Sequence, residues 1–202
     1  MGKQRAIDNL PDVLADIRPT RTSALEARSR DVLTSLRWPS GPECPRCGES
    51  ERLLWLESRS KWNCYACRYQ FSVTAGTLFH NSHLPLWKWF VAVHLLVERP
   101  EGTSASELGK ILPCSYKTAW FAAHRIRAAM GTARQRRRST LDSRRRRFAA
   151  PYFHSSLRYL HAYEDEQRWR SSHRGNGLAF RETLQALLRG EELPYRQLVG
   201  AA

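Results

Sequence analysis

The chain has 202 residues, of which 42% are hydrophobic and 26% charged, and its formal net charge is +14. This excess of Lys and Arg favours a polyanionic partner, with nucleic acid first and a membrane surface as the weaker alternative. The sequence contains no run of about 18 apolar residues that could span a bilayer, and residues 1–19 lack the apolar core of a secretion signal. These features predict a cytoplasmic protein that associates with the nucleoid and does not bind a membrane.

Residues 1–42 are predicted to form an N-terminal helical segment. Ser23 is a good N-cap for a helix over residues 24–36, which carries Leu, Val and Leu on one side. The helix should end at residues 37–42, because two prolines and a glycine within that stretch cannot continue it.

Residues 43–83 are predicted to form a zinc ribbon. Two C-x-x-C pairs are separated by sixteen residues, and three short strands are expected at residues 53–56, 61–63 and 69–74. Zn2+ prefers four ligands in a tetrahedron, and two such pairs supply four thiolates with no open position for water. We therefore expect a structural zinc ion, and the alternative is a redox-active pair. The predicted ligands are Cys44, Cys47, Cys64 and Cys67.

The predicted ribbon also carries a basic surface. Arg68 directly follows the second cysteine pair and is a candidate DNA contact, although an ordinary solvated charge is the alternative. The other basic residues of this surface are Arg46, Arg52, Arg59 and Lys61.

Residues 84–130 are predicted to form three helices. The first, over residues 85–97, is apolar on most of its surface and should pack centrally. The second runs over residues 104–112 from a capping box, and the third runs over residues 115–130 from a serine cap. The last two have the size and order of a helix-turn-helix, with a plain helical hairpin as the alternative.

The third helix of this segment would be the recognition helix. Small and apolar residues at helical spacing should face inward, and these are Ala119, Ala122, Ala123, Ile126 and Met130. His124 is expected to be buried, and Cys114 to be a turn residue. N-terminal residues of a recognition helix contact bases, and its basic residues contact phosphates. The expected DNA contacts are therefore Tyr116, Lys117, Thr118, Arg125 and Arg127.

The last part of the chain divides into an Arg-rich linker at residues 131–150 and a helical tail at residues 151–202. Residues 131–149 hold eight arginines and one aspartate. We interpret this run as a nonspecific contact to DNA phosphates, and the alternative is a remnant of an altered gene junction. In the tail, a second helix should follow residues 175–177 and end at Gly190. The expected fold is mainly α with a small β zinc ribbon.

Three motifs in this order resemble the N-terminal third of zinc-ribbon DDE transposases of bacterial insertion sequences. They are RWPSGPECPRCG (37–48), YACRYQFSVTAGTLFHNSHLPLWKWF (65–90) and SASELGKILPCSYKTAWFAAHRIRAAM (104–130). The resemblance implies a zinc ribbon and a helical segment that binds double-stranded DNA at the terminal repeats of the element. It also implies a following ribonuclease-H-like domain with three carboxylates. The C-terminal stretches 156–174 and 193–200 are similar to the end of such transposases.

The catalytic core is where the sequence departs from this family. About twenty residues lie between Met130 and Tyr152, too few for a ribonuclease-H-like domain. Residues 164–166 are consecutive acids that would point in different directions on one helix, and we expect them to form a solvated face. No catalytic residue is assigned.

These observations predict a truncated or internally deleted transposase that binds element ends without strand transfer, and that self-associates or associates with an intact transposase. One alternative is an active transposase component complemented by another chain. The other is a zinc-ribbon adaptor in transcription.

Overall fold

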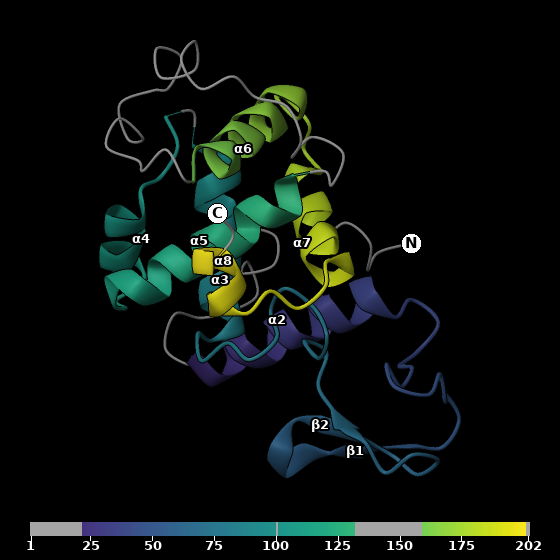
Figure 1. The fold of residues 1–202 in the computed structure, drawn as a ribbon. Coiled ribbons are helices and arrows are strands. Elements are labelled where there is room, and N and C mark those ends of the chain that lie inside the picture. Colours follow the sequence, from purple (N-terminus) through teal and green to yellow (C-terminus); the bar gives the residue numbers. More distant parts are fainter. Residues whose placement is uncertain (1–21, 100, 132–158, 201–202) are drawn as a thin grey trace.

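The computed structural model describes residues 22–99, 101–131 and 159–200 (Figure 1). The Arg-rich linker, the first half of the N-terminal segment and the beginning of the helical tail lie outside these residues. Over the described residues the fold is mainly helical with one small sheet, as the sequence predicted. None of the helices in those three stretches is long and apolar enough to cross a membrane.

The sheet is a three-stranded antiparallel ribbon in the order β1-β2-β3. Strand β1 (Leu53–Leu56) pairs with β2 (Lys61–Cys64), and a 3-10 turn (Glu57–Arg59) followed by left-handed Ser60 connects them. Strand β3 is only Gln70–Phe71, shorter than predicted. The chain leaves the sheet there because turns begin at Ser72, whose carbonyl accepts from the Ala75 amide.

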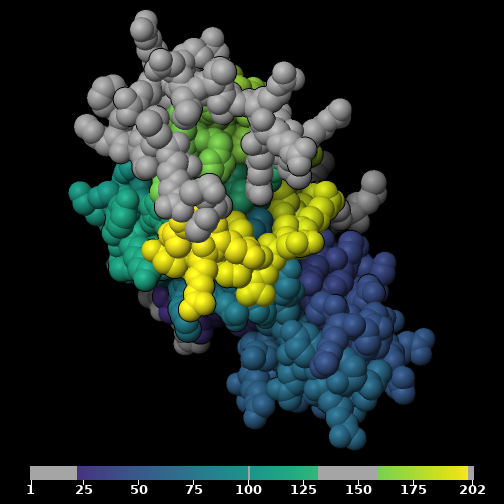
Figure 2. Space-filling view, viewed as in Figure 1, coloured from purple at the N-terminus to yellow at the C-terminus, as the bar shows by residue number. Residues whose placement is uncertain are grey.

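Five helices precede or follow the ribbon to make the main body of the molecule. They are α2 (Thr22–Arg37), α3 (Leu86–Glu98), α5 (Tyr116–Met130), α6 (Leu160–Ser172) and α7 (Ala179–Arg189). The short helices α4 (Ala105–Ile111) and α8 (Tyr195–Gly200) complete it. Figure 2 shows the ribbon as a separate lobe that projects from this helical body.

The predicted helix caps between α3 and α5 are confirmed. The Ser104 hydroxyl accepts a hydrogen bond from the Glu107 amide, and the Ser115 hydroxyl accepts one from the Thr118 amide. Gly109 of α4 lies close to the turn and to α5, because an added Cβ would lie 3.2 Å from the Cys114 carbonyl oxygen and 3.6 Å from the Cβ of Ala119. The inward residues predicted for α5 are all buried. The pair therefore packs through a compact inner face.

One hydrophobic core joins the N-terminal and C-terminal helices. Phe90 of α3 meets Phe180 of α7 edge to face with ring centroids 5.8 Å apart, and both side chains are fully buried. Leu33 of α2 and Ile126 of α5 lie in the same cluster. The helices after residue 159 are thus part of the same packed body as those before residue 131.

The acids of α6 do not form the solvated face that the sequence suggested. That expectation was wrong for Asp165 and Glu166, which are buried, because α6 packs this side against α5. The Glu166 carboxylate accepts from Nε of Arg127 at 2.6 Å, and both side chains have no solvent exposure. Arg170 approaches the same carboxylate at 3.6 Å.

This buried pair generates a stability prediction. Glu166→Gln removes the negative charge that compensates Arg127 in the interior, so the free energy of unfolding should fall by about 3–5 kcal/mol. Urea denaturation measures it, with Glu101→Gln at an exposed acid as the matched control. A loss below about 1 kcal/mol, the range of an exposed ion pair, would contradict a structural role for the pair.

Candidate metal centre and nucleic-acid interface

The four predicted zinc ligands come together at one end of the ribbon. Their sulfur atoms all lie within 4.8 Å of one another. The closest distances are 3.7 Å between the Sγ atoms of Cys44 and Cys67, and 3.6 Å between those of Cys47 and Cys64. A tetrahedral zinc ion with Zn–S bonds of about 2.3 Å requires sulfur atoms about 3.8 Å apart. The thiolate set therefore fits Zn2+.

Local backbone geometry explains how each cysteine pair is presented. In the first pair, Gly48 has a φ of 75° and its amide donates to the Cys44 carbonyl at 2.9 Å. In the second, Arg68 takes the equivalent left-handed conformation with a φ of 58°, and the Cys64 amide donates to Tyr69. Two similar turns thus offer two thiolates each from opposite sides.

Aromatic packing connects the metal centre to helix α2. Trp38, just after the helix, meets the Trp62 ring edge to face at 5.3 Å and the Phe71 ring at 5.9 Å. The Arg37 guanidinium stacks on Trp38 and donates to the Val73 carbonyl at 2.5 Å. Phe71 shares a buried cluster with Cys44 and Cys64, so one continuous packed layer joins the metal centre to the end of α2.

The comparisons with known proteins agree with this geometry. Residues 25–70 match the transposase zinc-ribbon domain family, and this stretch contains all four cysteines. The chain is also 30% identical over 118 residues to an uncharacterized protein in transposable element ISH50 of Halobacterium salinarum. That match covers 57% of this chain and 40% of the relative. No solved structure matches the chain.

The fold and the four-thiolate site define a zinc-ribbon protein whose Zn2+ is structural, because four cysteines occupy every position of the tetrahedron. More particularly, residues 25–70 are similar to the zinc ribbons of transposases, and the chain is similar to a protein of a transposable element. The chain spans about two fifths of the length of this relative.

Three of the predicted DNA contacts lie together at the first turn of α5. Tyr116 is 62% exposed, Lys117 is also exposed, and Thr118 is half-buried beside them. Arg68 is exposed, but it lies on the second cysteine turn of the ribbon.

Arg125 and Arg127 do not belong to this surface, and the structure removes them as candidate DNA contacts. Both side chains are essentially buried, with 1% and 0% exposure. Arg125 donates to the carbonyl oxygens of His80 at 2.7 Å and Leu193 at 3.1 Å, whereas Arg127 pairs with Glu166. Burial lowers the pKa of Arg125 to about 10, so the guanidinium stays charged at neutral pH.

His124 is buried as predicted. Its ring lies 4.1 Å from the Trp120 ring, centroid to centroid. Burial, helped by the positive charge of Arg127, lowers the pKa of His124 to about 3, so the imidazole is neutral at physiological pH. It adds no charge to a nucleic-acid surface.

Sequence reasoning missed one residue at the candidate interface. The Lys117 ammonium lies 4.8 Å from the centre of the Tyr195 ring, which belongs to helix α8. The ring is 40% exposed, so the contact forms at the surface. No local pattern signals it, because the two residues are separated by most of the C-terminal half of the chain.

The metal centre gives the second prediction. Cys64→Ser removes a ligand from the buried side of the site, so bound zinc should fall from about one ion per chain to well below that. The near-ultraviolet circular dichroism of the packed tryptophans should weaken with it. Cys114→Ser, at a cysteine outside the cluster, is the matched control. Retention of zinc by Cys64→Ser in metal analysis would contradict a four-cysteine site.

Proposed function

We propose that this chain is a DNA-binding protein that binds the terminal repeats of an insertion element without strand-transfer chemistry. The first turn of α5 carries the proposal: Tyr116, Lys117 and Thr118 are accessible there, while the inner face of the same helix is buried against α4. A recognition helix uses these positions to contact base edges and phosphates. The transposase zinc ribbon and the net charge of +14 support the same partner.

The acids of α6 support a role without catalysis. Two-metal strand transfer needs carboxylates that converge on two ions about 4 Å apart. Glu166 is engaged by Arg127, and Asp165 accepts from Arg168 at 3.1 Å. Within the described residues, the group of three or more His, Cys, Asp or Glu side chains close enough to share a metal ion is the cysteine cluster.

The packing of α5 on α6 supports an internal deletion in a longer transposase. An added Cβ at Gly131, just after α5, would lie 2.5 Å from the Asp165 carboxylate of α6. Helix α7 completes the core built by α2, α3 and α5. A protein of this kind would compete with an intact transposase for the same DNA ends, or associate with it.

Lys117→Ala tests the proposal directly. The exposed ammonium should contact a phosphate, so its loss should weaken duplex binding several-fold and reduce the dependence of log K on log salt concentration by about 1. Fluorescence anisotropy with duplexes of the terminal repeat and of random sequence measures both effects.

Arg189→Ala is the matched control, because Arg189 is an equally exposed cation in the last turn of α7. It should leave affinity and salt dependence close to those of the unmodified chain. Equal affinity for terminal-repeat and random duplexes, or binding indifferent to salt, would contradict the proposed function.

A further inference from the structure

A cavity of about 310 Å3 opens beside the first turns of α5. One wall is the loop that enters α3, the second is α5 itself, and the third is Tyr195 of α8. The buried Trp89 ring lies at its floor, with its indole N–H already satisfied by the Ser82 hydroxyl at 3.0 Å. The cavity therefore lies directly against the surface proposed to bind DNA.

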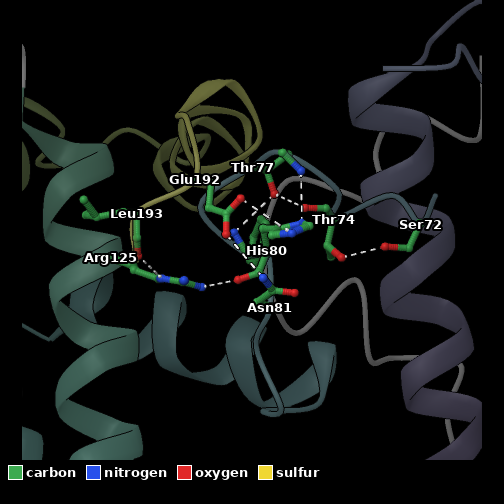
Figure 3. A network of polar contacts seen from close by, with 10 residues as sticks. Ser72, Thr74, Thr77, His80, Asn81, Arg125, Glu192 and Leu193 are labelled. Carbon is green, nitrogen blue, oxygen red and sulfur yellow. Dashed lines mark hydrogen bonds and ion pairs between the residues drawn. The ribbon is translucent and has the colours of Figure 1, made fainter. Parts of the chain in front are cut away.

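Arg125 fixes two walls of this cavity in place. From inside the body its guanidinium donates to the His80 carbonyl on the loop side and to the Leu193 carbonyl on the α8 side (Figure 3). Glu192 adds a second connection, because its carboxylate accepts from the side-chain amide of Asn81 at 3.3 Å and lies 3.6 Å from the His80 ring. Arg125 is thus a positioning residue for a preorganised pocket.

The lining combines aromatic surface with the exposed cation of Lys117. The Tyr195 ring lies 5.9 Å from the Phe121 ring, and the Lys117 ammonium sits over the exposed tyrosine. Bases stack on aromatic side chains of this kind, and an ammonium group pairs with the attached phosphate. A base inside a duplex cannot use such a pocket, because its two faces are covered by neighbouring pairs, whereas an unpaired base can enter it.

We propose that this pocket binds one unpaired nucleotide of DNA, with the base against Tyr195 and the phosphate at Lys117. The inference rests on the proposed DNA-binding function and adds a preference for DNA that carries an unpaired base next to the duplex. It also gives the C-terminal helix α8 a part in the interface.

The test compares three DNA probes with the zinc-loaded full chain by fluorescence anisotropy. One probe is a blunt duplex, the second carries one extra unpaired nucleotide, and the third carries an abasic residue at that position. The second should bind about fivefold or more tightly than the other two, in line with the stacking of one base. Tyr195→Ala should abolish the difference, and Tyr195→Phe should keep it because the ring remains.

Tyr65→Ala is the control for loss of an exposed tyrosine, since Tyr65 is 61% exposed on the ribbon. It should leave the preference intact. Equal binding of the three DNA probes would overturn the pocket while leaving the proposed function standing. A larger gain from an unpaired ribonucleotide in RNA would overturn the assignment to DNA, and no binding of any probe would overturn both proposals.

Discussion

The contact between α3 and α7 is the interaction on which the helical body depends. Phe90 and Phe180 meet at its centre without solvent exposure, and the apolar sides of α2 and α5 close around them. Full burial of such a ring contributes about 1.5–3 kcal/mol, and an edge-to-face pair adds about 1 kcal/mol. Removing α7 would expose the apolar surface of α3, so the helices before residue 131 rely on those after residue 159.

This shared core changes the interpretation of the two segments whose sequences resemble transposases, one before residue 131 and one after residue 159. The sequence alone predicts a DNA-binding segment and a separate helical tail, with no catalytic core between them. In the structure, the tail supplies α7 to the core, Glu166 to Arg127, and Leu193 to Arg125. The C-terminal segment is therefore built into the body that presents α5.

Features set by local chemistry were predictable from sequence. The cysteine spacing predicted the zinc ligands. The serine caps predicted where α4 and α5 begin, and the apolar run predicted the central helix α3. Their physical causes lie within a few residues of each feature, so no distant contact is needed to recognise them. The match to the transposase zinc-ribbon family supports the zinc centre independently.

Features set by distant partners were not predictable. Arg125 and Arg127 lie on a helix that looks basic and solvated from its sequence, yet each is buried because a partner more than thirty residues away satisfies it. Tyr195 joins the surface because Arg125 holds the segment before α8 at Leu193 and Asn81 holds it at Glu192. Polar contacts between residues distant in the sequence leave no periodic pattern. These contacts determine which cations face the solvent.

Native-state hydrogen exchange of the zinc-loaded chain tests the shared core most directly. If α3, α5 and α7 form one body, their slowest amides should open with the same free energy, as one cooperative unit. If the amides of α7 exchange at a clearly lower free energy while those of α3 and α5 remain protected, the C-terminal helices are an appendage and the account is contradicted.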